Sequence, residues 1–258
     1  MNSPRSSEFR ALHEGEPFLI PNPWDAGSAR MLEEFGFKAL ATTSSGFAFT
    51  LGRADGDVTL DEVIAHTRTL AAAVSIPVAV DLENGYGRAA AEAAHAVRAA
   101  AEAGAAGGSI EDWDAEAGLY PLDEAVERIA AAADAARETG FVLAARAENH
   151  IRGNPDLDDT IARLQAYERA GADVLYAPGI RGDEIRAVCA AVARPVNVLA
   201  FPGMKAADVF AAGAQRISVG GQLTWVAAAA AAEAAVALRD TGDFDALKAR
   251  LQGTDWLR

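Results

Sequence analysis

The feature that most constrains this chain is a short apolar run followed by an amphipathic, alanine-rich helical segment, a pattern that recurs eight times. The apolar runs are nearly continuous, which is typical of strands buried on both faces of a parallel sheet. They predict strands at 18–22, 38–43, 77–83, 107–112, 141–148, 173–178, 195–200 and 216–221. The segments between them predict helices at 25–35, 59–75, 88–103, 122–139, 157–170, 183–193, 205–212 and 222–240.

Eight strand–helix units predict an α/β fold, a single (β/α)8 barrel that spans residues 1–258. The alternative is an open doubly wound sheet, but no G-x-G-x-x-G follows the first strand, which disfavours its dinucleotide-binding form. Thr59 followed by Glu62 is a capping-box signature for a helix start. Glycines stand where five predicted helices end, as expected for caps with positive φ: Gly36, Gly104, Gly140, Gly171 and Gly213.

Composition disfavours several classes of protein. The formal net charge of −14 argues against nucleic acid or an anionic membrane as a partner, because either would repel the surface. No segment has the length and hydropathy of a membrane span, and the N-terminus lacks the apolar core of a signal peptide. The one cysteine, Cys189, cannot form a disulfide within the chain. We therefore expect a cytoplasmic protein.

Three acidic residues follow neighbouring predicted strands at the end where barrel active sites lie. Asp81 and Glu83 end the run "PVAVDLE", and Glu111 ends the next strand. Two residues apart on an ideal strand, Asp81 and Glu83 would point the same way. A hard divalent cation such as Mg2+ would relieve the repulsion among three carboxylates. The alternative interpretation is that these acids cap helices or pair with arginines.

The remaining polar residues at the predicted strand ends support an anion site better than a zinc site or a Schiff base. Of the four histidines only His150 lies at a strand end, which disfavours a zinc site, and no lysine lies at a strand exit, which disfavours a Schiff base. Arg146 ends an apolar strand, where a guanidinium needs an anion. Glu111, Glu148 or a substrate carboxylate would serve. Ser44-Ser45-Gly46 offers hydroxyl and backbone N–H donors for an oxyanion.

The sequence resembles the isocitrate lyase / phosphoenolpyruvate mutase superfamily. The matching stretches run in order along nearly the whole chain: "NPWDAGSARMLEEFGFKAL", "LGRADGDVTLDE", "PVAVDLENGYG", "SIEDW", "AARAEN", "AGADVLYAPG" and "PVNV". The resemblance implies a (β/α)8 barrel whose last helix, here 222–240, is exchanged between subunits of a homodimer, with dimers pairing into a homotetramer. It also implies a small carboxylate as substrate.

The resemblance further implies roles for single residues. Mg2+, with Mn2+ as an alternative, would be held largely through water by Asp81, Glu83 and Glu111. The residues implied to bind substrate are Ser44 or Ser45, Gly46, Asp81, Arg146 and Asn197. Asp55 matches an acid on a mobile loop beside the site. The shared chemistry makes or breaks a bond next to a pyruvate-like unit, leaving an enolate on the metal.

The chain departs from this superfamily after Glu111-Asp112. The lyases carry a Lys-Lys/Arg-Cys-Gly-His loop there and the mutases carry a loop with Lys and Asn, whereas "EDWDAEAGLYPLDEA" has none of Lys, Cys, His or Asn. Candidates to replace the loop acid are Asp55, Tyr86, Asp112, Tyr120 and His150. We expect a Mg2+-dependent decarboxylase or carbon–carbon lyase for a small 2-oxo or 2-hydroxy acid. A phosphonopyruvate-type P–C bond enzyme and a non-catalytic carboxylate-binding barrel are the alternatives.

Overall fold

The computed structural model describes residues 3–248 and contains one sheet of eight parallel strands. The strands pair in the order β1-β10-β9-β8-β7-β4-β3-β2. At the seam between β1 and β2 the Ala41 N–H donates to Pro21 O at 3.1 Å, and Asn22 Nδ2 donates to Thr42 O at 2.9 Å. The sheet therefore forms a nearly closed barrel, and the predicted (β/α)8 fold class is confirmed. The strands are β1 (Phe18–Ile20), β2 (Leu40–Ala41), β3 (Val78–Asp81), β4 (Gly107–Glu111), β7 (Val142–Arg146), β8 (Val174–Tyr176), β9 (Val196–Leu199) and β10 (Arg216–Ser218).

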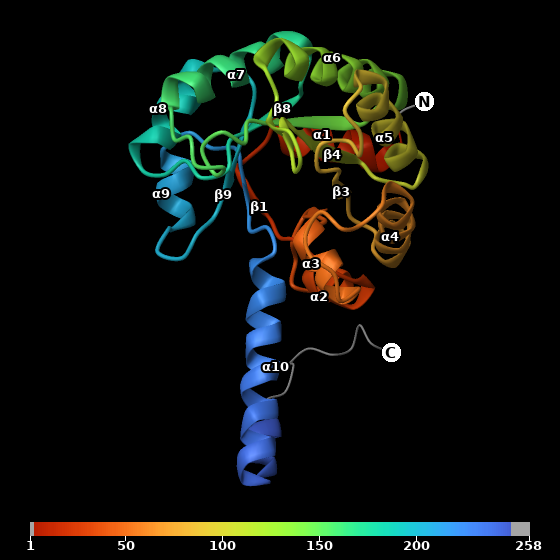
Figure 1. Cartoon of the computed structure of the whole chain (residues 1–258), viewed down its shortest axis with the longest axis vertical. Helices are drawn as coiled ribbons and strands as arrows, with labels where there is room; N and C mark the ends of the chain where they lie inside the picture. The colour runs from red at the N-terminus through yellow and green to blue at the C-terminus, as the bar shows by residue number, and fades with distance from the viewer. Residues whose placement is uncertain (1–2, 249–258) are drawn as a thin grey trace.

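Helices follow the strands and surround the barrel (Figure 1). The capping box predicted at Thr59 is present, and all five predicted cap glycines have positive φ, between 78° and 109°. All eight predicted helices are present: α2 (Ala26–Glu34), α4 (Leu60–Ala73), α5 (Ala90–Glu102), α6 (Leu122–Thr139), α7 (Leu157–Ala170), α8 (Asp183–Ala191), α9 (Ala206–Ala211) and α10 (Gln222–Thr241). Local capping signals and apolar periodicity thus position the loops that follow the strands.

The structure contains several helices and strands that were not predicted from the sequence. Helix α1 (Pro4–Leu12) places Phe9 inside the barrel at the end where the strands begin, against Phe18 and Val142. Gly107 makes room for the ring, because a Cβ there would lie 2.7 Å from Phe9 Cε1. The other additions are α3 (Ser44–Thr50), a hairpin of β5 (Trp113–Asp114) and β6 (Gly118–Leu119), and a 3-10 helix η1 (Phe244–Lys248).

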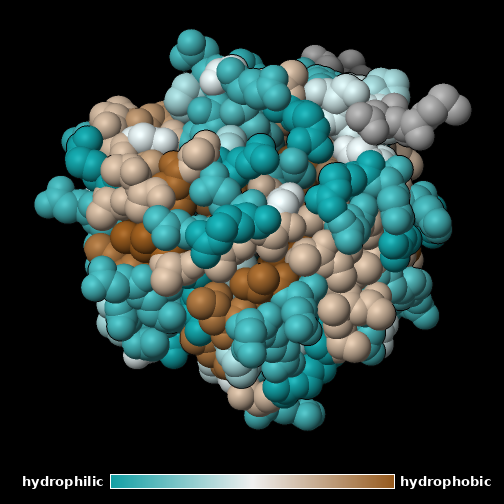
Figure 2. All heavy atoms as spheres, turned by 90° about the horizontal axis from the view of Figure 1, so that it is seen from above, coloured by the Kyte–Doolittle hydropathy of each residue, from teal (hydrophilic) through white to brown (hydrophobic). Residues whose placement is uncertain are grey.

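Helix α10 (Gln222–Thr241) projects away from the barrel (Figure 1). Its apolar residues include Trp225 and Val226, which are 48% and 67% exposed. The opposite end of the molecule shows a different surface, where hydrophilic and weakly hydrophobic residues are mixed and strongly hydrophobic areas are small (Figure 2). No helix among the described residues is long and apolar enough to cross a membrane.

Candidate active site

A cavity of about 290 Å³ opens where the strands end. Six residues predicted for the site line it: Ser44, Ser45, Asp55, Asp81, Arg146 and Asn197. Its mouth includes Ile151 and Arg152, and it reaches into the barrel as far as Ile20 and Arg216. The residues chosen because they lie at predicted strand ends therefore come together around one cavity.

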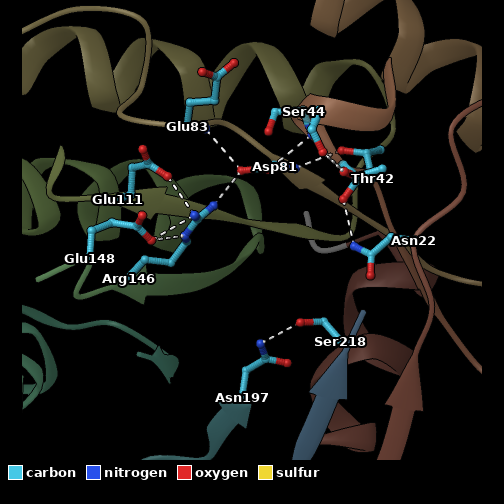
Figure 3. Close-up of polar contacts among 12 residues, drawn as sticks. Asn22, Thr42, Ser44, Asp81, Glu83, Glu111, Arg146, Glu148, Asn197 and Ser218 are labelled. Atoms are coloured by element: carbon cyan, nitrogen blue, oxygen red, sulfur yellow. Dashed lines mark hydrogen bonds and ion pairs between the residues drawn. The ribbon is translucent and has the colours of Figure 1, made fainter. Parts of the chain in front are cut away.

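Arg146 is the centre of the acidic side of this cavity (Figure 3). Its Nη1 lies 2.9 Å from Asp81 Oδ1, and its Nη2 lies 2.8 Å from both Glu111 Oε2 and Glu148 Oε1. Burial lowers the pKa of Arg146, the carboxylates of Glu111, Glu148 and Asp81 raise it, and the net result lies well above the ordinary value. Of the anions that the sequence offers for Arg146, both protein carboxylates, Glu111 and Glu148, pair with it.

Asp81 is held in place by donors from β2 and α3. Its backbone N–H donates to Thr42 Oγ1 at 2.9 Å, and its Oδ2 accepts from the Ser44 N–H at 3.3 Å. The expected Ser-Ser-Gly turn is in fact the first turn of α3, capped by the Thr43 side chain, which accepts from the Gly46 N–H. The backbone donors of this turn therefore point partly at Asp81 and partly at their own cap.

Glu83 does not point the same way as Asp81, so that expectation from strand spacing is wrong. Strand β3 ends at Asp81, and Glu83 follows with a left-handed φ of 48° that turns its side chain away (Figure 3). Tyr86, with φ of 60°, donates from its hydroxyl to Glu83 Oε1 at 2.9 Å. Burial and the charge of Asp81 raise the pKa of Glu83 to about 7.

The three predicted metal ligands do not converge on one point. Among the described residues no group of three or more His, Cys, Asp or Glu side chains is arranged to hold a metal ion directly. The guanidinium of Arg146 lies between Asp81 and Glu111 instead. Asp81, Glu83 and Glu111 therefore cannot all bind one metal ion directly in this arrangement.

The donor set nevertheless fits a cation that keeps most of its water. The carboxylates of Asp81, Glu111 and Glu148 pair with the guanidinium groups of Arg146 and Arg152. Those of Asp55 and Glu83 lie close enough to feel the same charges, so the acids outnumber the two arginines. Burial raises the pKa of Glu111, and partial burial together with the Asp81 charge raises that of Asp55. Mg2+ retains several waters and needs only one or two carboxylates. Asp81, which lines the cavity, is the natural direct ligand.

Asp55 lies at the mouth of the cavity, in the loop between α3 and α4, and its carboxylate accepts a hydrogen bond from the Ser44 side chain. Ser45 Oγ lies 3.2 Å from Thr43 Oγ1. Gly46 does not line the cavity; a Cβ there would lie 2.5 Å from Thr224 Oγ1, so its lack of a side chain serves packing against α10. These positions place Ser44 and Ser45, but not Gly46, on the cavity wall.

Asn197 belongs to the other wall. Its Nδ2 donates to Ser218 Oγ at 3.0 Å, and its Oδ1 accepts from Arg216 Nε at 2.8 Å. Figure 3 shows Asn197 and Ser218 apart from the group around Arg146, which lies across the site. The cavity thus has an acidic wall and a wall of hydrogen-bond donors.

Four of the five candidates to replace the loop acid lie outside the cavity lining: Tyr86, Asp112, Tyr120 and His150. Asp112 is buried, where its Oδ2 accepts from Arg163 Nη1 at 3.0 Å and from the Tyr167 hydroxyl, and its Oδ1 accepts from the Glu148 N–H at 2.8 Å. His150 Nδ1 lies 3.1 Å from Thr160 Oγ1 and its Nε2 lies 3.4 Å from Glu184 Oε1. Both oxygens of Asp112 already accept hydrogen bonds from the protein, and only 5% of the His150 side chain is exposed.

Several cavity residues were not predicted from sequence to bind substrate or metal, or to act in catalysis. Glu148 and Arg152 follow β7 and were detectable as charged residues at a strand end. Arg216 begins β10, whereas Tyr176 and Ser218 are the last residues of β8 and β10. The strands expected from sequence run on to residues 178 and 221, so the choice of polar residues at predicted strand ends overlooks all three.

Comparison with known proteins agrees with this geometry. A family model for phosphoenolpyruvate phosphomutase matches residues 9–239. The chain belongs to the phosphoenolpyruvate phosphomutase family. This family lies within the isocitrate lyase / PEP mutase superfamily of lyases and mutases that act on small carboxylates, and the chain is an enzyme of this lyase type.

Individual relatives support the assignment to this family. A crystal structure of a protein assigned as a lyase/mutase from Burkholderia cenocepacia J2315 superposes with a TM-score of 0.94 and 49% identity, covering 98% of this chain and 95% of that one. Oxaloacetate decarboxylase of Rhodopseudomonas palustris HaA2 is 33% identical, over 83% of this chain and 77% of its own length. The 2-methylisocitrate lyase of Escherichia coli K12 is 33% identical over 70% of this chain and 64% of its own length.

Proposed function

We propose that this protein is a Mg2+-dependent decarboxylase of a small 2-oxo dicarboxylate, with oxaloacetate as the first substrate to test. The observation that carries the proposal is one cavity with two unlike walls, carboxylates in excess on one and hydrogen-bond donors with a buried guanidinium on the other. A hydrated divalent cation suits the first wall and a carboxylate suits the second. The similarity to an oxaloacetate decarboxylase points to the same chemistry.

The segment after β4 favours decarboxylation over cleavage by an acid on a loop. Residues 112–122, which include the β5–β6 hairpin, contribute no side chain to the cavity lining. Trp113 of the hairpin packs against the Arg152 guanidinium, 4.9 Å from ring centroid to Cζ, and Tyr120 is buried. A lyase step on a larger substrate needs a side chain that exchanges a proton with the departing group. Loss of CO2 needs none.

In the proposed reaction the C3–C4 bond of oxaloacetate breaks, CO2 leaves, and the electron pair remains as the enolate of pyruvate, which water protonates at C3. Bound Mg2+ would supply positive charge beside the oxygen where that negative charge develops. Asp81 would hold the cation, with Glu83 and Glu111 binding its water. Thr42 and Ser44 fix Asp81, and Arg146 holds Glu111 and Glu148 at a set distance from it.

The test is release of CO2 and pyruvate from oxaloacetate by purified protein with Mg2+, measured against Mg2+ alone because the free cation also promotes this reaction. Asp81→Ala and a chelator should each return the rate to the uncatalysed level. A panel with phosphonopyruvate, followed by phosphorus NMR, covers the alternative P–C bond reaction. If oxaloacetate is turned over no faster than by Mg2+ alone, the proposal is wrong.

We also propose that the protein assembles through α10 as a homodimer or homotetramer. Trp225 contacts Phe49 edge to face, 5.2 Å between ring centroids, yet both rings stay about half exposed. Val226 and Val236 further along the helix are exposed as well. An apolar helix surface of this kind is stabilised when a partner covers it, and a second copy of this chain offers the same surface in return.

A further inference from the structure

Arg216 is a buried cation inside the barrel. It is the first residue of β10, only 6% of its surface is exposed, and it lines the inner part of the cavity. Burial lowers its pKa to about 10, so the guanidinium remains charged at neutral pH. Isolated buried charge is strongly unfavourable unless an opposite charge or hydrogen bonds compensate it.

The described partners of Arg216 are neutral. Its Nε donates to Asn197 Oδ1 at 2.8 Å, and its Nη1 lies 3.1 Å from His13 Nε2. His13 Nδ1 lies 2.8 Å from Phe9 O, which requires the proton on Nδ1 and leaves Nε2 as an acceptor. Burial, and then the charge of Arg216, lower the pKa of His13 to about 3, so the ring carries no charge.

The contrast with Arg146 is informative. Arg146 is surrounded by three carboxylates of the protein. For Arg216 none of the ion pairs found within residues 3–248 supplies a carboxylate, although the same cavity touches both guanidinium groups. An anion that enters the cavity would therefore gain more from Arg216, whose charge is uncompensated, than from Arg146.

Donors on the neighbouring strands complete a site for an anion. Asn197 Nδ2 and Ser218 Oγ are 3.0 Å apart, and the Tyr176 hydroxyl is hydrogen bonded to Ser218. Arg216 also fixes the amide of Asn197, since a guanidinium can only donate and must face the Oδ1 atom. The amide NH2 is thereby directed to Ser218 on the cavity wall.

We propose that Arg216, with Asn197 and Ser218, binds one carboxylate group of the substrate. The identity of the ligand as a small dicarboxylate rests on the proposed function; the anion site itself does not. The substrate carboxylate is the negatively charged partner that Arg216 lacks within the protein. The carboxylates of the opposite wall attract Mg2+. A neutral or cationic analogue finds no compensation at this wall.

The test uses a variant that gives Arg216 a carboxylate of its own. Asn197→Asp places an acid 2.8 Å from Arg216 Nε, where the amide oxygen now lies. We expect the melting temperature to be maintained or raised, because a buried ion pair replaces an unpaired charge. We expect the affinity for oxalate with Mg2+, measured by calorimetry, to fall at least about tenfold, the size of one charge-assisted contact.

Arg216→Met should weaken oxalate binding to the same extent, and Arg216→Lys should restore part of it. Two matched controls should bind oxalate like the wild type. Asn154→Asp adds the same charge at an exposed position, and Arg10→Met removes an arginine that pairs with Asp173 near the same end of the barrel. Wild-type oxalate affinity in Asn197→Asp and Arg216→Met, equal losses in the controls, or no oxalate binding by the wild type would each overturn the inference.

The outcomes separate this inference from the proposed function. If the wild type binds oxalate in a manner that depends on Arg216 but releases no CO2 from oxaloacetate, the anion site stands and the proposed reaction is wrong. If Asn197→Asp decarboxylates oxaloacetate with an unchanged KM, the reaction stands and the role of Arg216 is wrong.

Discussion

The Tyr86 hydroxyl donates a hydrogen bond of 2.9 Å to Glu83 Oε1, and both residues hold left-handed backbone. Such a conformation costs a non-glycine residue about 1–3 kcal/mol, and it persists where the surrounding structure enforces it. Here Gly85 lies between them against Ala93 of α5, and Arg128 donates to the Asn84 carbonyl. The strained turn therefore sets the direction of the Glu83 carboxylate at the edge of the acidic wall.

Tyr86→Phe should raise the pKa of Glu83 above its value of about 7, because the lost hydrogen bond favours the ionised form. If ionised Glu83 helps to hold the cation, Mg2+ affinity at pH 7 should fall several-fold, and the pH midpoint of Mg2+ binding should move upward. Calorimetric Mg2+ titrations from pH 6 to pH 9 measure both. In a Glu83→Gln background the tyrosine substitution should have no further effect; an effect of equal size there would show that Tyr86 acts independently of Glu83.

Glu83→Gln should stabilise the metal-free protein at high pH. The pKa of Glu83 is raised from 4.5 to about 7. The stability that Glu83 contributes is therefore fully present below pH 4.5, where the carboxyl is protonated in the folded and unfolded states alike. It is lost as the pH rises through 7. The difference corresponds to about 3 kcal/mol at pH 8.5, and to little at pH 5. Urea unfolding with a chelator at the two pH values measures it. Glu102→Gln, at an exposed site on α5, is the control, and a gain that is the same at both pH values would contradict the assignment.

Strand ends could be predicted from sequence because apolar runs and cap glycines act locally. That placed Asp81, Arg146 and Asn197 on the cavity wall. The direction of the Glu83 side chain could not be predicted in this way. The sequence "DLENGYG" gives no signal for the positive φ that Glu83 and Tyr86 adopt. The extended geometry assumed for that segment is what failed.

Arg216 illustrates a second limit. It stands at the start of its strand, and its side chain reaches the cavity from inside the barrel. Helix α1, which supplies His13 beside it, has only weak amphipathic character, and its anchor Phe9 fits because Gly107 lacks a side chain. Contacts between residues far apart in the sequence determine the surroundings of Arg216. Local sequence patterns carry no information on such contacts.

Asp112 should prove structural, not catalytic. Both its oxygens accept hydrogen bonds from the protein, and one of these holds the Glu148 N–H beside the cavity. Asp112→Ala leaves the Arg163 guanidinium without this partner, so we expect unfolding to become easier by about 3–5 kcal/mol. Urea unfolding measures this, with Asp134→Asn on the exposed face of α6 as the control. A fully stable Asp112→Asn protein that has lost turnover would instead support a chemical role.

Substitutions on α10 should separate assembly from folding. Val226 and Val236 are exposed in the single chain, so Val226→Asp and Val236→Asp bury no charge within the subunit and should leave its melting temperature nearly unchanged at low concentration. In an assembly that covers these residues each introduced carboxylate would be desolvated, at a cost of several kcal/mol. We therefore expect the double variant to run as a monomer by size-exclusion chromatography with light scattering, while the wild type runs as a dimer or tetramer. Glu233→Gln, at an exposed site on the same helix, should assemble like the wild type. A wild type that is monomeric at the same concentration, or a double variant that still assembles, would show that α10 is not the interface.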